Sequence, residues 1–170
     1  MTSPDVIATL RRIVGTAAPE TQALLADEHL RYQFYLDALA ATSAAEERVV
    51  LTAVLGDNDK VMSEAAVTKH VDRTAGAMGS SSAFTEWARG LSDVFDGVDF
   101  TRRRVAEWTL FLRAAEGITP SADDIAAATD WLQRKLATEV SSRDTLELLS
   151  SVGRTKRVRN IAADRARKAP

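Results

Sequence analysis

Apolar residues recur at intervals of three and four along nearly the whole chain, and most of these stretches end at a glycine. This spacing places the apolar side chains on one face of an α-helix, and a glycine just past the last of them is typical of a helix end. No segment sustains the alternation of apolar and polar residues that is typical of a half-buried strand. The sequence therefore predicts an all-α fold of about nine helices joined by short turns.

Capping residues and prolines mark where most of these helices are expected to begin. The expected starts are Ser3, Pro19, Ser43, Asp59, Asp99, Thr119, Ser142 and Thr155. Two of the helices are expected to run without a break, over residues 20–39 and 120–140. In the first of them, His29 shares a stripe with Leu25, Tyr32 and Leu36, which predicts a core or boundary histidine bonded to a neighbour. Short connections pack sequence neighbours antiparallel, so we expect stacked antiparallel helix pairs.

Composition narrows the classes of protein further. The chain has 170 residues, of which 45% are hydrophobic and 27% charged, and it contains no cysteine. These values fit one globular domain or one short repeat array, and the lack of cysteine excludes disulfides, thiolate catalysis and cysteine-ligated zinc. No apolar run reaches the roughly 18 residues of a membrane span, and the start of the chain does not resemble a signal peptide. We therefore expect a cytoplasmic protein without a membrane partner.

A single all-helical domain over residues 1–170 is the expected organisation. The segment with the strongest turn signals contains Gly76, Gly79 and three consecutive serines at 80–82. Glycine and serine clusters between periodic segments are typical of loops. A flexible joint is therefore expected near residues 76–83.

Two segments match each other in register. The first contains Leu51, Leu55, Gly56, Val61, Ala65 and Ala66, and the second contains Leu148, Val152, Gly153, Val158, Ala162 and Ala163. Each predicts a tight helical hairpin in which the glycine adopts the left-handed conformation that ends a helix. The small residues are expected to face the partner helix, so that the two helices approach closely.

This pattern resembles HEAT-type helical repeats, in which a turn with charged residues precedes a valine and small residues at the start of the second helix. The matching positions are Asp57, Asp59 and Val61 in the first segment and Arg154, Lys156 and Val158 in the second. The resemblance covers about a third of the chain and implies a right-handed array of stacked helix pairs. An irregular helical bundle with two similar turns is the alternative.

No catalytic or metal-binding motif is present in the sequence. His70 has no second histidine three or four residues away. Asp57 and Asp59 resemble the start of a calcium loop, but Met62 occupies the position of the required glycine and Thr68 that of the required glutamate. Nucleophile-elbow and phosphate-loop motifs are also absent. We therefore expect no enzyme activity, no cofactor and no metal, although tertiary contacts could still form a catalytic site.

The basic segment near the C-terminus is the strongest functional signal. The candidate partner-binding residues are Arg154, Lys156, Arg157, Arg159, Arg165 and Arg167, together with Trp131. On a helix the cations would spread over the polar side while Val158 and Ile161 face inward. Trp131 flanks the stripe of Leu132 and is expected to be partly exposed, where tryptophan can anchor a partner.

The charge balance of the whole chain hides an asymmetry. Residues 1–100 contain 8 basic and 15 acidic residues, and residues 101–170 contain 14 and 9. Opposed charges of this kind favour contact with an acidic protein surface, or a homo-oligomer in which the acidic half meets the basic half of a second copy. Phosphate contact with nucleic acid is the alternative. The resemblance permits it, because some HEAT-like proteins bind DNA. The favoured hypothesis is a non-enzymatic protein–protein interaction module, an adaptor or scaffold component.

Overall fold

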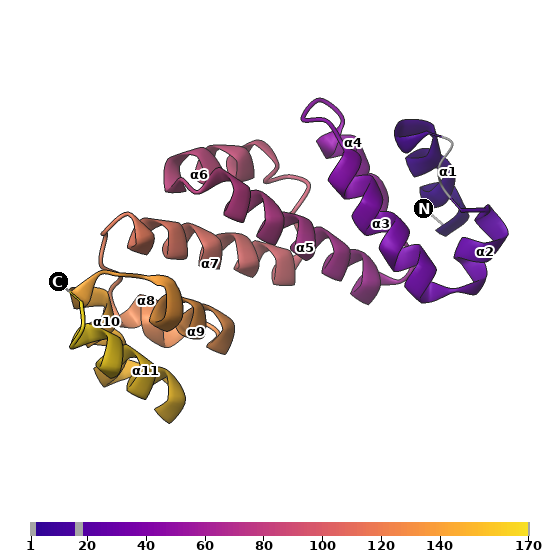
Figure 1. The fold of residues 1–170 in the computed structure, drawn as a ribbon. Coiled ribbons are helices and arrows are strands. Elements are labelled where there is room, and N and C mark those ends of the chain that lie inside the picture. The colour runs from indigo at the N-terminus through magenta and orange to yellow at the C-terminus, as the bar shows by residue number, and fades with distance from the viewer. Residues whose placement is uncertain (1–2, 16–18, 170) are drawn as a thin grey trace. The chain divides into compact units, whose positions relative to one another are not determined.

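The computed structural model describes residues 3–15 and 19–169, and within these residues the chain forms eleven helices and no strand (Figure 1). The helices are α1 (Ser3–Val14), α2 (Thr21–Ala26), α3 (Glu28–Ala41), α4 (Glu47–Leu55), α5 (Lys60–Met78), α6 (Ser81–Gly90), α7 (Asp99–Ala115), α8 (Ala122–Ala127), α9 (Asp130–Glu139), α10 (Arg143–Val152) and α11 (Lys156–Ala166). The all-α prediction is confirmed.

The helices belong to two compact units. The first unit comprises Met1–Ala77 and Ala88–Arg104, and the second comprises Met78–Trp87 and Val105–Pro170. The segment expected to be a joint is mostly helical, because α5 continues through Gly76 to Met78 and α6 begins at Ser81. The expectation of a single domain stays a prediction.

Each unit has its own apolar core. In the first unit α1 packs against α2, α3 and α4, and in the second α10 packs against α8, α9 and α11 (Figure 1). Fully buried side chains of the first core include Ile7, Leu10, Leu24, Tyr35, Val50, Leu51 and Val54. Those of the second core include Phe84, Ile125, Leu132, Leu136, Leu146 and Leu149. Burying one such side chain contributes about 1.5–3 kcal/mol, so these residues supply most of the driving force for folding.

The helix predicted over residues 20–39 is broken at Asp27. Asp27 has φ −126° and ψ 110°, and its carboxylate accepts hydrogen bonds from the backbone N–H groups of His29 at 2.9 Å and Leu30 at 3.1 Å. These bonds cap the start of α3. The sequence prediction was wrong here because an aspartate also fits the polar face of an unbroken helix.

His29 lies on the outside of the molecule, and the prediction of a core or boundary histidine was wrong. Its side chain is fully exposed, next to the helix start that Asp27 caps. The buried face of α3 consists of Arg31, Phe34, Tyr35, Ala38 and Leu39. Because α3 carries apolar residues on several sides, the spacing alone did not identify the face that packs against α2 and α4.

The helix predicted over residues 120–140 is also two helices, α8 and α9. Ala128 and Thr129 between them are extended, with ψ values of 144° and 165°. The buried carboxylate of Glu107 accepts hydrogen bonds from the backbone N–H of Thr129 at 2.9 Å and from its hydroxyl. This contact comes from α7, so the helix-forming alanines before Thr129 gave no sign of the break.

The two matching hairpins differ in what they bury. Val158 is 3% exposed, whereas Val61 at the equivalent position is 84% exposed. Of the small residues predicted to face a partner helix in the first hairpin, Ala66 is fully buried, whereas Ala65 is exposed. Neither hairpin glycine is left-handed, because Gly56 has φ −72° and Gly153 has φ −56°.

A buried carboxylate connects three segments of the first unit. Asp57 is fully buried in the turn between α4 and α5. Its Oδ1 accepts a hydrogen bond from the Ser3 hydroxyl at 3.1 Å and from the backbone N–H of Asp59 at 2.7 Å, and its Oδ2 accepts one from the Tyr35 hydroxyl at 2.5 Å. Burial, together with the hydrogen bond to Asp57, raises the pKa of Tyr35 far above its ordinary value.

The pKa of Tyr35 predicts a loss of stability at alkaline pH. Above about pH 10 the unfolded chain loses the Tyr35 proton while the folded chain keeps it, so the free energy of unfolding falls by about 1.4 kcal/mol per pH unit from this residue. Urea unfolding of wild-type protein and of Tyr35→Phe between about pH 9 and pH 11 measures this slope. Equal slopes for the two proteins would contradict the prediction.

Candidate functional site

The basic segment begins at the connection between α10 and α11. We call residues 152–157 the basic turn; they comprise the end of α10, the connection and the first two residues of α11. Ser142 caps α10 by accepting a hydrogen bond from the backbone N–H of Thr145, and Thr155 caps α11 in the same way with Val158. The cap at Ser142 and a helix start near Thr155 were predicted from the sequence, and both are confirmed. The two helices pack against each other, and both contact α9.

Gly153 permits this close packing. A Cβ atom at residue 153 would lie 2.5 Å from the backbone oxygen of Leu149 and 3.0 Å from Cγ1 of Val158. Glycine is therefore required here by close approach of the backbone, since its φ of −56° is accessible to any residue.

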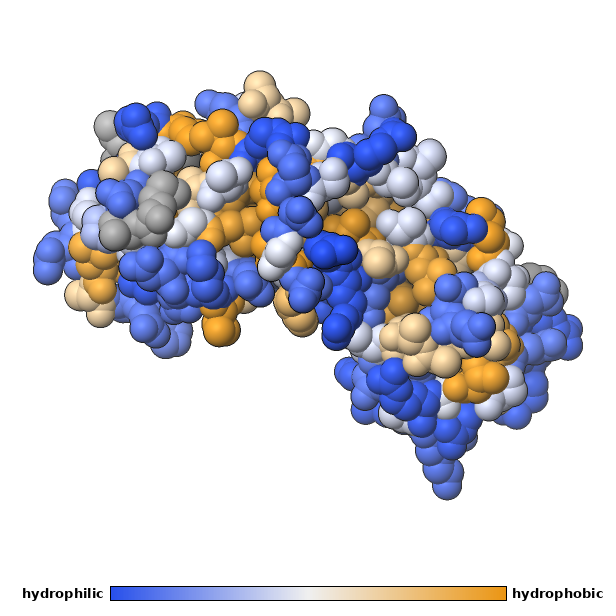
Figure 2. Space-filling model, turned by 180° about the vertical axis from the view of Figure 1, so that it is seen from behind, coloured by the Kyte–Doolittle hydropathy of each residue, from blue (hydrophilic) through white to orange (hydrophobic). Residues whose placement is uncertain are grey.

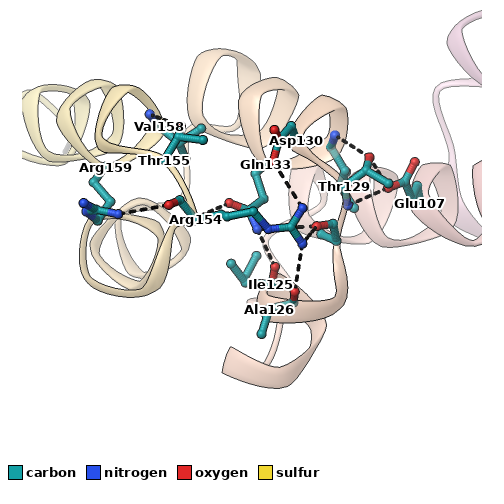
Figure 3. Close-up of polar contacts among 12 residues, drawn as sticks. Glu107, Ile125, Ala126, Thr129, Asp130, Gln133, Arg154, Thr155, Val158 and Arg159 are labelled. Carbon is teal, nitrogen blue, oxygen red and sulfur yellow. Dashed lines mark hydrogen bonds and ion pairs between the residues drawn. The ribbon is translucent and has the colours of Figure 1, made fainter.

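Arg154 is held by polar contacts within the second unit (Figure 3). Its guanidinium donates to the backbone oxygens of Ala126 at 3.2 Å and Ala128 at 2.8 Å, and lies 3.2 Å from a carboxylate oxygen of Asp130. Its backbone N–H donates to Oε1 of Gln133 at 2.8 Å. Arg154 thus occupies the C-terminal end of α8, where unpaired carbonyl groups favour a cation.

Gln133 fixes this arrangement from inside the unit. It is 1% exposed, and its side-chain amide donates to the backbone oxygen of Ile125 at 2.7 Å while its oxygen accepts from Arg154 (Figure 3). A buried amide with both ends paired is stabilising, whereas an unpaired one is costly. Gln133 was not singled out in the sequence, because a lone glutamine gives no signal of burial.

The other arginines predicted to bind a partner also have partners inside the chain. Arg159 donates to the backbone oxygen of Gly153 at 2.7 Å, and Arg165 donates to that of Ala137 at 2.9 Å. Arg167 and Lys168 both contact the carboxylate of Asp164 and hold its pKa below its ordinary value. These contacts account for four of the cations without any external partner.

Lys156 and Arg157 differ from the other cations of the segment. Both are exposed, and no side-chain hydrogen bond or ion pair links them to any other described residue. They lie in the first turn of α11, which contains no acidic residue. Because the amino end of a helix carries partial positive charge, two cations in this turn are unfavourable for the isolated chain.

Trp131 is half-buried, whereas the neighbouring Leu132 is buried. Its ring meets that of Trp108 edge to face, with ring centroids 5.6 Å apart. The ammonium of Lys135 lies 4.6 Å from the centroid of Trp108 and 4.4 Å from that of Phe111, in cation–π geometry. A shallow hollow of about 450 Å³ borders Trp131, Arg134 and Lys135.

The charge asymmetry is smaller in the structure than in the sequence. The first unit contains 14 acidic and 11 basic residues, and the second contains 10 and 11, because the three arginines at 102–104 belong to the first unit. On the face shown in Figure 2, hydrophilic residues cover most of the second unit, at the right, with hydrophobic residues in smaller patches. The two units therefore do not have the strongly opposed net charges that the two parts of the sequence indicated.

His70 is part of a structural network rather than a pocket. It is 6% exposed; its Nε2 lies 2.6 Å from Glu47 Oε1, and its Nδ1 lies 2.7 Å from an Arg73 nitrogen. Because a guanidinium can only donate, Nδ1 accepts and the proton of the neutral ring is on Nε2, where it is shared with Glu47. Among the described residues no group of three or more histidine or carboxylate side chains could hold a metal ion, and no described helix is long and apolar enough to cross a membrane.

No protein-family model, curated protein or solved structure matches the chain in sequence or fold comparisons.

The close approach at Gly153 predicts a large effect of a small substitution. Gly153→Ala would force apart the backbone of α10 and the side chain of Val158, at a cost of about 2 kcal/mol in the free energy of unfolding. Gly76→Ala is the matched control, because a Cβ there meets nothing within 4 Å and alanine favours the interior of α5. It should stabilise by up to about 1 kcal/mol. Thermal unfolding of the two variants distinguishes these outcomes.

The internal contacts of Arg154 predict that the basic residues are not equivalent. Arg154→Ala should destabilise by about 1–2 kcal/mol, because it leaves carbonyl groups at the end of α8 unpaired. Arg157→Ala should change the free energy of unfolding by less than about 0.5 kcal/mol. Urea unfolding of both variants tests this, and equal losses would show that Arg157 has a structural role too.

Proposed function

We propose that the chain is a non-enzymatic interaction module of the cytoplasm that binds an acidic surface of a partner protein through the basic turn. The observation that carries the proposal is the state of Lys156 and Arg157. They are the cations of the basic segment without an internal partner among the described residues, and they share a helix turn with no acidic residue. An external anion would offset the repulsion between these two cations and the partial positive charge at the amino end of α11.

The surroundings of the basic turn support this role because they are rigid. Gly153, the Thr155 cap and the contacts of Arg154 and Arg159 fix the backbone from which Lys156 and Arg157 project. A side chain on a fixed backbone loses less conformational freedom on binding than one on a loop. Val152, four residues before Lys156 in the same turn, is 39% exposed and adds an apolar group to this segment.

The helical architecture also suits an adaptor. The hairpin of α10 and α11 is the segment that resembles a HEAT-type unit, and such helix pairs present their turns and faces to partners. We extend the proposal to a HEAT-like unit at this end of the chain. The proposal does not extend to the hairpin at Val61, whose buried face differs.

Charge reversal at the two free cations tests the proposed function. The double variant Lys156→Glu/Arg157→Glu should lose binding to a fluorescently labelled glutamate-rich peptide, measured by anisotropy at about 50 mM salt. The same variant should gain about 0.5 kcal/mol of stability per substitution, because the acids then lie at the amino end of α11. Loss of binding with a gain in stability separates a binding role from a structural one.

Arg134→Glu is the matched control, since Arg134 is an exposed cation on α9 whose side chain has no hydrogen bond or ion pair among the described residues. It should leave peptide binding unchanged. A labelled DNA duplex forms the second arm of the experiment. Binding of the duplex but not of the peptide would overturn the proposal in favour of nucleic acid, and binding of neither at low salt would overturn both.

A further inference from the structure

A groove in the first unit has features complementary to the basic turn. It lies between the first turns of α3 and α5 and has a volume of about 380 Å³. Tyr32, Val61, Met62 and Ala65 supply its apolar lining. Val61 is 84% exposed, and Ala65 lies one helical turn further along the same face of α5. Among the described residues of the first unit, no element covers Val61.

The rim of the groove is acidic. Glu28 and Asp59 border it from the two helices, and exposed His29 lies beside Glu28. No ion pair or side-chain hydrogen bond of Glu28 occurs among the described residues, and Asp59 Oδ2 lies 4.0 Å from the guanidinium of Arg31. Lys60, next to Asp59 in sequence, donates to the backbone oxygen of Leu55. The rim therefore retains negative charge that could meet cations from outside.

We propose that the groove receives the basic turn of a second copy of this chain. Val152 would enter the apolar groove against Val61, while Lys156 and Arg157 would pair with Glu28 and Asp59. The basic turn contains two exposed cations and one exposed valine, and the groove contains two carboxylates and an apolar lining, so the two surfaces match in number and in sign. This inference rests on the proposed function, because it names the partner that the basic turn binds.

The geometry of such a contact has a definite consequence. The two surfaces lie in different units of the chain, so one copy uses its groove and the other its basic turn. A contact between unlike surfaces is heterologous and propagates as a ring or a filament. Because one groove is small, the contact is weak, with a Kd of about 10–100 μM, and it weakens with salt.

Two complementary variants test the assignment. Lys156→Glu/Arg157→Glu blocks the basic turn and leaves the groove intact, and Glu28→Lys/Val61→Lys blocks the groove and leaves the basic turn intact. All four positions are exposed, so the fold should persist, which circular dichroism checks. Sedimentation velocity at about 50 mM salt is expected to show that the wild-type protein assembles further as its concentration rises. Each variant alone is expected to sediment as a monomer of 18.5 kDa. An equimolar mixture of the two variants is expected to form a heterodimer.

The outcomes separate this inference from the proposed function. Wild-type protein that stays at 18.5 kDa at about 0.5 mM overturns the inference, while its binding to the glutamate-rich peptide would keep the proposed function. Variants that assemble alone, or that fail to pair when wild type assembles, also overturn it. Glu86→Lys and Arg134→Glu are the control variants, as exposed charges outside both surfaces, and both should assemble as wild type does.

Discussion

The unpaired backbone carbonyls at the ends of short helices are the constraint on which this structure depends. Each helix leaves its last carbonyl groups without an intrahelical donor, and eleven helices in the described residues make many such ends. Basic side chains meet this need: Arg31 donates to Leu24 of α2, Arg73 to Leu39 of α3, Lys60 to Leu55 of α4, Arg48 to Gly90 of α6, Arg154 to Ala126 of α8, Arg165 to Ala137 of α9 and Arg159 to Gly153 after α10. A cation there also interacts favourably with the helix dipole.

This use of basic residues explains why the sequence overestimated the number of cations in the basic segment that are available to bind a partner. A run of arginines has the same appearance whether its guanidinium groups face solvent or carbonyl oxygens of another helix. Arg154, Arg159 and Arg165 donate hydrogen bonds to such oxygens, so their guanidinium groups already have partners within the second unit. Lys156 and Arg157 remain exposed, so the candidate binding surface of the basic segment is reduced to these two cations.

The sequence predicted local features well and tertiary ones poorly. The cap at Ser142 and the helix start near Thr155 depend on a few neighbouring residues, and the structure confirms both. The break before α9 depends on Glu107 of α7, and the role of Gly153 depends on the approach of Val158. Neither distant partner can be read from a single stretch of chain. The exposed groove at Val61 was missed for the same reason, since its valine matched a buried one in the other hairpin.

The distribution of aromatic residues gives each unit its own optical reporter. All three tryptophans, Trp87, Trp108 and Trp131, belong to the second unit, whereas both tyrosines, Tyr32 and Tyr35, belong to the first. Tryptophan emission therefore follows the environment of the second unit, and tyrosine absorbance follows that of the first. Coincident transitions by the two signals would identify one cooperative domain, and separate transitions would identify two. Wild-type protein, without any label, can thus reveal how the two units are coupled.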